Sequence, residues 1–260
     1  MRLALYQMMS ADRSIAETTS LLDQACAEAA QGGADLIIFP EMALTGYNIG
    51  AERIRQLAET RDGPMVQSLI DMARRHGIGI LCGFPELENE RVFNAAVLID
   101  GGGKVLSVCR KAHLFGDVDR AAFSAADSLC PLVKFGDWSV GLAICYDVEF
   151  PELVRAYALG GADAVLVPTA NMQPYVGVAT RVVPARAEEN EIYVAYANRV
   201  GVEGAFEYCG LSCVTGPDGI DVARAGLGEG MIFADLSKDV VARVRKTLSH
   251  LEDRRSDLYS

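Results

Sequence analysis

The chain has 260 residues, half of them hydrophobic, which is enough for one large α/β domain or two small ones. Its formal net charge of −11 argues against binding to nucleic acid or to an anionic membrane surface. No apolar run reaches the ~18–20 residues that a membrane helix needs. Seven cysteines without a CxxC pair, and three scattered histidines, argue against a zinc site or a disulfide framework. The N-terminus shows no cleavage-type signal, so we expect a cytoplasmic protein.

In the N-terminal half, short uncharged runs alternate with stretches that carry an apolar stripe at helical spacing. The stretch 12–31 is the clearest helix, because its alanines and leucines share one stripe and Gly32-Gly33 ends it. The stretch 100–103, Asp-Gly-Gly-Gly, predicts a hairpin turn. The predicted strands are 2–8, 36–39, 78–83, 92–99 and 104–110, the further helices are 51–60 and 65–75, and a loop covers 112–130.

The C-terminal half continues the alternation. A second hairpin turn, Gly216 to Gly219, joins two short strands. A glycine-rich stretch, 201–210, is expected to be a loop. The predicted strands are 132–135, 138–144, 162–168, 191–198, 211–215, 220–224 and 230–235, and the predicted helices are 151–160, 175–189 and 236–246.

The order of elements favours one domain over 1–260, because the chain has no repeat, linker or low-complexity segment. The polar tail 247–260 is expected to be a C-terminal arm that packs on a neighbouring copy. Parallel crossovers occur beside tight hairpins, so the sheets should be mixed. Ten to twelve strands are many for one open sheet. We therefore expect an α/β protein with two mixed sheets packed face to face, each covered by helices.

The stretch 139–152, SVGLAICYDVEFPE, carries the most chemistry. Its uncharged run up to Ile144 is typical of a strand that is buried on both faces, and Pro151 suits the first turn of a helix. Cys145 therefore lies where a buried strand turns into a helix, beside free backbone N–H groups. This placement makes Cys145 a candidate nucleophile. The alternative is a buried structural cysteine.

Three apolar strands that are distant in the sequence each end in a reactive side chain, namely Glu41, Lys111 and Cys145. Functional sites of α/β proteins form at the carboxyl ends of strands. A carboxylate can accept the thiol proton, and an ammonium group favours the thiolate and a developing oxyanion. The alternative is that Glu41 and Lys111 are ordinary charges that face solvent.

Three blocks around these residues resemble the signature blocks of the nitrilase superfamily, the carbon–nitrogen hydrolases. They are PEMALTGY (40–47), RKAHLF (110–115) and CYDVEFPE (145–152), and they occur in the family's order. The segments 167–175 and 186–201 are also similar to that family. The resemblance covers essentially the whole chain. It implies a four-layer α-β-β-α sandwich that commonly assembles into dimers or larger homo-oligomers.

The resemblance also implies a catalytic glutamate, lysine and cysteine, which fall on Glu41, Lys111 and Cys145. The family usually has a second glutamate a few residues before a phenylalanine, whereas this sequence has only aspartates there. Asp119 matches best by its distance to Phe123, and Asp117 is the alternative. Either aspartate could instead be a solvated loop charge.

The run HLFGDVDRAAFSA, together with LTGYNIG, is similar to the aliphatic amidase branch, which includes 5-aminopentanamidase and R-stereoselective amidase. The expected reaction is hydrolysis of a small aliphatic amide to a carboxylic acid and ammonia through a thioester. Glu41 would act as base while Cys145 attacks, and Lys111 with the Tyr146 N–H would stabilise the oxyanion. This chemistry requires no cofactor and no metal.

The substrate is less constrained than the reaction. Glu149 lies four residues after Cys145, and an acid there predicts a substrate with a cationic amine, such as an ω-amino or amino-acid amide. Alternatively, Glu149 caps its helix or pairs with Arg155. Tyr47 and Asn171, with the neighbouring Met172, follow strand ends and are candidates to line the substrate site. Packing or turn formation is the alternative for all three.

Other functions remain open at this point. Within the hydrolases, the substrate could be a nitrile or an N-carbamoyl amine. A papain-like pair of Cys145 and His113 is a further possibility, because His113 follows Lys111 by two residues. The non-enzymatic alternative is a catalytically silent scaffold or binding subunit, against which the complete set of reactive residues argues.

Overall fold

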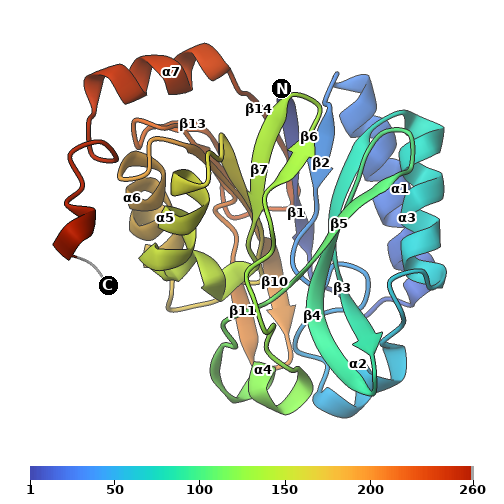
Figure 1. Ribbon diagram of the computed structural model, residues 1–260. Helices are drawn as coiled ribbons and strands as arrows, with labels where there is room; N and C mark the ends of the chain where they lie inside the picture. The colour runs from blue at the N-terminus through green and yellow to red at the C-terminus, as the bar shows by residue number, and fades with distance from the viewer. Residues whose placement is uncertain (259–260) are drawn as a thin grey trace.

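The computed structural model describes residues 1–258, and two mixed β-sheets form its centre (Figure 1). The first sheet has eight strands, with β14 pairing antiparallel to β1 beside the main path. In spatial order, its strands are β11 (Phe206–Cys209), β10 (Arg199–Glu203), β1 (Arg2–Met9), β2 (Leu36–Ile38), β3 (Gly79–Glu88), β4 (Arg91–Ile99) and β5 (Val105–Arg110), with β14 (Gly230–Asp235).

The second sheet has six strands. Its central strands β7, β8 and β9 are parallel, while its edges are antiparallel hairpin strands. In spatial order, its strands are β13 (Asp221–Arg224), β12 (Cys213–Thr215), β9 (Tyr193–Ala197), β8 (Ala164–Pro168), β7 (Trp138–Leu142) and β6 (Val133–Phe135).

Helices cover the outer face of each sheet, so the predicted four-layer α-β-β-α sandwich is confirmed (Figure 1). Two helices, α1 (Ile15–Gln31) and α3 (Pro64–His76), pack on the first sheet. The second sheet is covered by α5 (Pro151–Leu159) and by α6 (Val183–Glu188), which follows a π-helical turn at Val178–Val182. Two short helices, α2 (Ala51–Leu57) and α4 (Gly116–Ala122), lie at one end of the sandwich, and α7 (Lys238–Thr247) lies at the other.

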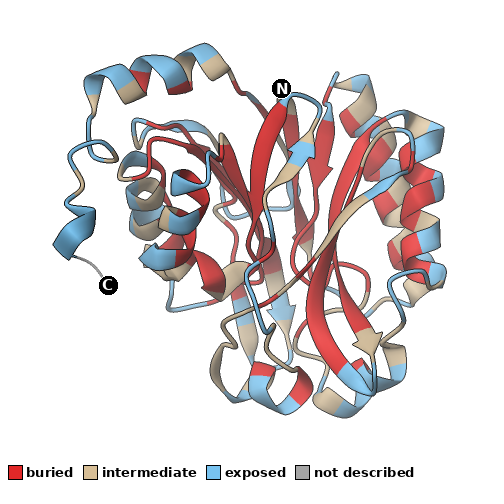
Figure 2. Cartoon of the chain, in the orientation of Figure 1, coloured by how far each residue is buried: buried red, intermediate tan, exposed pale blue. Residues whose placement is uncertain are grey.

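The core between the two sheets is made of side chains that alternate along the strands. Leu36 and Ile38 of β2 face the second sheet, while Ile37 between them packs toward α1 and α3. Leu142 and Leu166 meet them from the second sheet. Burial of each such side chain contributes about 1.5–3 kcal/mol, and Figure 2 shows that both sheets are buried along most of their length.

Three segments differ from the sequence-based predictions. Part of the expected loop 112–130 is helical, as α4. The expected loop 201–210 is largely a hairpin, because β10 and β11 pair and Gly204 takes a left-handed φ of 59° between them. The expected helix 175–189 begins as turns and becomes α-helical only at Val183. Most other predicted elements differ from the observed ones by one to three residues at their ends.

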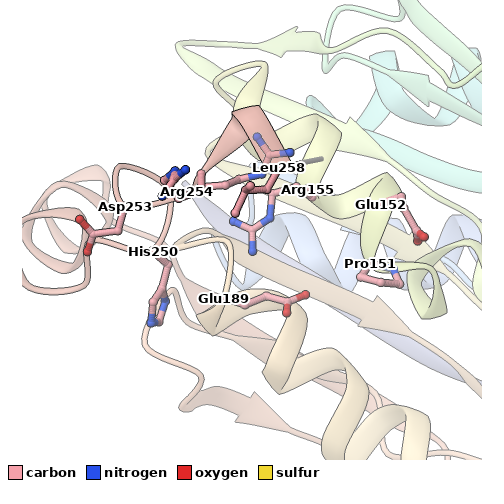
Figure 3. Close-up of a pocket in the computed structure, with 9 residues that line it drawn as sticks. Pro151, Glu152, Arg155, Glu189, His250, Asp253, Arg254 and Leu258 are labelled. Atoms are coloured by element: carbon pink, nitrogen blue, oxygen red, sulfur yellow. The ribbon is translucent and has the colours of Figure 1, made fainter. Parts of the chain in front are cut away.

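The C-terminal segment that follows α7 runs back along α5, as far as the described residues extend (Figure 1). Between this segment and the helices lies a cleft of about 830 Å³ (Figure 3). Its lining includes Arg155, Glu189 and His250, and none of the three strand-end residues expected to carry the chemistry. The expected contact of residues 247–260 with a neighbouring copy, and the homo-oligomer, stay predictions. No helix within residues 1–258 is long and apolar enough to cross a membrane.

Candidate active site

The topology brings the three expected strand ends to one place. Strands β2 and β5 point in the same direction in the first sheet, because one parallel and two antiparallel pairings separate them. Their carboxyl ends therefore deliver Glu41 and Lys111 to the same edge. β7 of the second sheet delivers Cys145 from the opposite layer. A backbone hydrogen bond from Glu41 N–H to the Thr169 carbonyl, 3.3 Å long, joins the two sheets at this point.

Cys145 occupies a sharp turn, as its sequence context predicts. Ile144 is extended, Cys145 has a left-handed φ of 47°, and a 3₁₀ turn over Cys145–Glu149 follows before α5 begins. A left-handed φ at a residue with a side chain costs on the order of 1–3 kcal/mol and persists where the surrounding structure enforces it. The turn thereby holds the Cys145 side chain against the core between the sheets.

Glu41 is fully buried and its two carboxylate oxygens differ. Oε1 accepts hydrogen bonds from Lys111 Nζ and from Asn94 Nδ2, both at 2.7 Å. Oε2 is buried and has no hydrogen-bond partner among the described residues. Burial raises the pKa of Glu41, although Lys111 and Asn94 oppose the increase. Oε2 is therefore the atom that is free to accept a proton.

Lys111 is also fully buried and lies between two carboxylates. Its Nζ is 2.7 Å from Glu41 Oε1 and 2.7 Å from Asp119 Oδ2. Burial alone would lower the pKa of Lys111, but Glu41, Tyr47 and Asp119 together hold it well above its ordinary value. The raised pKa favours the ammonium form of the lysine, and two partners leave one of its three N–H donors for another acceptor.

The two candidate aspartates are clearly separated by their surroundings. Asp119 is buried, accepts hydrogen bonds from the Tyr47 hydroxyl at 2.9 Å and the Phe115 N–H at 2.8 Å, and contacts Lys111. Asp117 lies on the exposed face of α4, with Arg120 3.9 Å away. The structure therefore brings Asp119, and not Asp117, to the Glu41–Lys111 pair.

The Cys145 thiol has a raised pKa. Burial is the largest cause, the Glu41 carboxylate adds to it, and Lys111 opposes it without cancelling it. The sequence-based interpretation that the ammonium favours a thiolate is thus incomplete, because desolvation outweighs the ammonium in the free enzyme. The raised pKa favours the neutral thiol over the thiolate, so Cys145 requires an adjacent base when it reacts.

Glu149 is half-buried at the end of the 3₁₀ turn. Its carboxylate makes no hydrogen bond or ion pair with any residue in 1–258, and it neither caps α5 nor pairs with Arg155. Burial raises its pKa, against the opposing charges of Arg186 and Lys111. Both structural alternatives considered for Glu149 are therefore absent, and its carboxylate remains available.

The other predicted pocket residues have mainly structural contacts. Tyr47 is buried and donates its hydroxyl to Asp119, so it contacts the site through that acid. The Asn171 side chain donates to the Tyr175 carbonyl, and its backbone pairs with Asn198. Met172 packs in an apolar cluster that also contains Tyr47 and Tyr208. These contacts match the packing and turn alternatives that the sequence also allowed.

Tyr146 and His113 both pack against aromatic rings near Cys145. The Tyr146 ring makes edge contacts with Phe115 and Phe150, whose centroids are 5.3 and 5.0 Å away. His113 stacks on Phe150 at 3.8 Å, and its Nδ1 is 2.8 Å from Asp147 Oδ1. The hydrogen bond to Asp147 raises the pKa of His113. No hydrogen bond joins a His113 ring nitrogen to Cys145 within residues 1–258, so the structure does not show the papain-like pair.

Two further residues at the site were missed by the sequence analysis. Asn94 interrupts the apolar run of β4 and donates to Glu41. Arg199 is 2% exposed, and its guanidinium donates to the backbone carbonyls of Glu41 and Met42. For Asn94, a polar residue inside an otherwise buried strand was the available signal, since buried polar groups need partners. Arg199 begins the partly exposed strand β10 and offered no such signal.

The comparisons with known proteins agree with this geometry. The sequence profile described as carbon–nitrogen hydrolase matches residues 2–246. The chain belongs to the carbon–nitrogen hydrolase family. The expectation of an enzyme that acts on non-peptide carbon–nitrogen bonds is thereby confirmed. Within residues 1–258, this carbon–nitrogen hydrolase has no group of three or more histidine, cysteine, aspartate or glutamate side chains that could hold a metal ion.

Two relatives align over nearly the whole carbon–nitrogen hydrolase chain. A Pseudomonas protegens protein described as "Hydrolase in pqqF 5'region" is 46% identical over 260 residues, which cover 100% of this chain and 90% of the relative. An (R)-stereoselective amidase from Pseudomonas sp is 34% identical over 256 residues, which cover 98% and 92%. This similarity agrees with the predicted resemblance to the amidase branch.

Among solved structures, an amidase from Nesterenkonia sp. AN1 is similar over 100% of this chain. One of its structures, a complex with butyramide, has a TM-score of 0.85 and 34% identity, with 95% of that chain covered. Another shows the result of Michael addition of acrylamide at the active-site cysteine of that amidase, also with a TM-score of 0.85 and 34% identity, and 98% covered.

Proposed function

We propose that this carbon–nitrogen hydrolase is a cysteine-dependent amidase that converts a small aliphatic amide into a carboxylic acid and ammonia. The observation that carries the proposal is the buried network of Glu41, Lys111 and Asp119 next to a thiol held in a strained turn. The butyramide complex of the Nesterenkonia amidase supports a short aliphatic amide as substrate.

In the proposed reaction, Glu41 Oε2 takes the proton of Cys145 while the sulfur attacks the amide carbonyl. The free N–H of Lys111 and the backbone N–H of Tyr146 stabilise the resulting oxyanion. Glu41 then gives the proton to departing ammonia, which leaves a thioester. A water molecule activated by Glu41 releases the carboxylic acid and regenerates the thiol.

Asp119 completes this arrangement as the second carboxylate in contact with Lys111 Nζ, besides Glu41. Its own position is fixed by Tyr47 and by the Phe115 N–H. An aspartate here reaches Lys111 at 2.7 Å because α4 brings its backbone close. In this proposal, Asp119 keeps the ammonium group in place and charged through the reaction, and the shorter side chain suffices for that role.

A first experiment tests the reaction itself. Cys145→Ala should abolish ammonia release from butyramide while the protein stays folded, because no other group supplies the nucleophile. Ammonia release from an amide, a nitrile and an N-carbamoyl amine of equal chain length, measured with the unchanged enzyme, should be fastest for the amide. Turnover retained by Cys145→Ala would remove Cys145 from the mechanism, and a faster nitrile or carbamoyl reaction would replace the amide as substrate.

A second experiment tests the substrate class. The unpaired carboxylate of Glu149 favours an ω-amino amide, so kcat/KM for 5-aminopentanamide should exceed that for pentanamide roughly tenfold, as expected for one close charge pair. Glu149→Gln should remove the difference without lowering kcat/KM for pentanamide. Glu152→Gln, an exposed acid one turn further on, is the matched control and should keep the preference. Equal rates for both amides in the unchanged enzyme would contradict the hypothesis.

A further inference from the structure

Two buried hydroxyl groups lie beside Cys145 and have no part in the reaction described above. Thr169 directly follows β8, and Tyr196 belongs to β9. Both side chains are 0% exposed, and neither hydroxyl oxygen has a hydrogen-bond partner among the described residues. Buried polar groups are nearly always partnered, so two adjacent exceptions next to a nucleophile call for an explanation.

The position of the Thr169 and Tyr196 hydroxyl groups relative to the Cys145 sulfur indicates their role. Burial raises the pKa of the Cys145 thiol, but the Thr169 hydroxyl and the Ala170 N–H act in the opposite direction as hydrogen-bond donors. The Thr169 hydroxyl acts in the same way on Tyr196, whose pKa burial raises well above its ordinary value. The strands agree with this placement, because β8 pairs in parallel with β7 on one side and with β9 on the other, with Leu166 opposite Leu142 and Val167 opposite Tyr196. Thr169, which follows β8, therefore lies between the segment that carries Cys145 and the strand that carries Tyr196. Hydrogen bonds of catalytic groups are often long in a free enzyme and shorten during the reaction.

The backbone of Thr169 is fixed from both sheets. Its N–H donates to the Ala197 carbonyl at 2.9 Å, and its carbonyl accepts the N–H of Glu41 at 3.3 Å. The hydroxyl is thus held in a constant relation to the catalytic carboxylate as well as to the thiol. Because its backbone is fixed in this way, the Thr169 hydroxyl can donate to the sulfur without movement of a loop.

The groups that face the Cys145 sulfur determine where its proton can go. Glu41 and Lys111 face Cys145 from the first sheet, together with Tyr47, and Tyr196 faces it from β9. Glu149 acts on Tyr196 from the 3₁₀ turn. Glu41 is the carboxylate that acts on the sulfur, and its Oε2 is free to accept a proton. Donors on the other side of the sulfur would therefore turn the S–H bond toward Oε2.

We propose that Thr169, backed by Tyr196, is a positioning residue that donates its hydroxyl hydrogen bond to the Cys145 sulfur and so directs the thiol proton to Glu41 Oε2. The phenol of Tyr196 donates to the Thr169 oxygen, which leaves the threonine hydrogen for the sulfur. When Glu41 removes the thiol proton, the same donor stabilises the sulfur anion. No covalent bond to Thr169 or Tyr196 forms, and the inference rests on the proposed function of Cys145 as nucleophile.

The test compares Thr169→Val, which keeps the shape and removes the hydroxyl, with Thr169→Ser, which restores the hydroxyl. Kinetics with butyramide and the rate of Cys145 alkylation by iodoacetamide against pH are measured for both. Alkylation is followed on the Cys145 peptide by mass spectrometry, and it does not depend on amide turnover. The peptide of Cys130, whose pKa is lowered to about 7 by its hydrogen bond with Cys109, serves as internal control.

Thr169→Val should lower kcat roughly ten- to hundredfold with little change in KM, as expected for a lost hydrogen bond to a charged group. Its alkylation midpoint for Cys145 should move upward by about one pH unit, and Thr169→Ser should return both values toward the unchanged enzyme. Tyr196→Phe should show a smaller effect of the same sign. Tyr193→Phe removes a hydroxyl on the same strand, one that contacts Ser237. This change should alter neither kcat nor the alkylation midpoint of Cys145.

Equal losses in Thr169→Val and Thr169→Ser, or an unchanged alkylation profile in folded Thr169→Val, would overturn the inference. If Thr169→Val does not fold, Tyr196→Phe against Tyr193→Phe decides by the same two measurements. Absence of amide turnover in the unchanged enzyme would contradict the proposed substrate, while the alkylation profiles would still test the role of Thr169.

Discussion

At the scale of single residues, the state of Glu41 should set the lower pH limit of the reaction. Burial raises its folded-state pKa above that of an ordinary glutamate, about 4.3. Below the raised pKa the carboxyl group is protonated and cannot accept the thiol proton. We therefore expect kcat/KM to fall as the pH falls through a midpoint above the ordinary value. A pH profile of kcat/KM with butyramide measures it.

A substitution at Asn94 tests whether the acid midpoint belongs to Glu41. Its amide donates to Glu41 Oε1 and stabilises the charged form. Asn94→Leu should therefore move the acid midpoint further upward, by up to about one pH unit. A midpoint at or below pH 4 in the unchanged enzyme, or a downward shift in Asn94→Leu, would contradict the assignment of Glu41 as base.

The sequence predicts the site residues that end uncharged strands and misses those that support them. Glu41, Lys111 and Cys145 stand out because a reactive group follows an apolar run. The roles of Asn94 and Arg199 depend on hydrogen bonds to Glu41, which lies 53 and 158 positions away in the sequence. Local sequence carries no information about such pairings. The free Oε2 of Glu41 is likewise a property of the packed site, so sequence alone could not identify it.

At the scale of elements, the start of α1 is encoded locally. Ser14 caps the helix, its hydroxyl accepts the Glu17 N–H, and the Glu17 carboxylate accepts the Ser14 N–H. Ser14→Ala should lower the free energy of unfolding by about 1 kcal/mol, because one helical N–H loses its acceptor. Urea unfolding measures the change. Ser20→Ala, at an exposed interior position of α1, is the control and should be neutral or slightly stabilising.

The elements that the sequence analysis missed are those whose stability comes from other parts of the chain. Helix α4 has only seven residues, and the contact of Asp119 with Lys111 fixes it to the site. The β10–β11 hairpin contains two glycines, Gly201 and Gly204, yet β10 pairs with the end of β1. Periodicity over so few residues is weak. Tertiary contacts therefore decide the structure of both segments.

At the scale of the whole molecule, the arrangement of the sheets follows from contacts that are distant in the sequence. β1 pairs with β2, β10 and β14, which begin 34 to 228 residues later in the chain. The number of apolar strands predicted two covered sheets. Their order could not be predicted from local patterns, and it is this order that places the ends of β2 and β5 opposite β7.

The layer between the sheets should therefore control activity as well as stability. Leu166 of β8 lies in this layer, whereas Leu69 of α3 lies in the outer layer, and both are fully buried. Replacing either leucine by alanine should lower the free energy of unfolding by about 2–5 kcal/mol. Only the first change should also alter the separation between Cys145 and Glu41, since those residues belong to opposite sheets.

We expect Leu166→Ala to lower kcat roughly tenfold in fully folded protein, because a displacement of about 1 Å at a reacting group can cost up to ~100-fold. Leu69→Ala should keep kcat within about twofold, although its loss of stability is similar. Urea unfolding and butyramide kinetics at a temperature where both variants are folded measure the two effects separately. Equal kcat values in the two variants would show that the site tolerates relaxation between the sheets, and that the strained turn at Cys145 alone fixes its geometry.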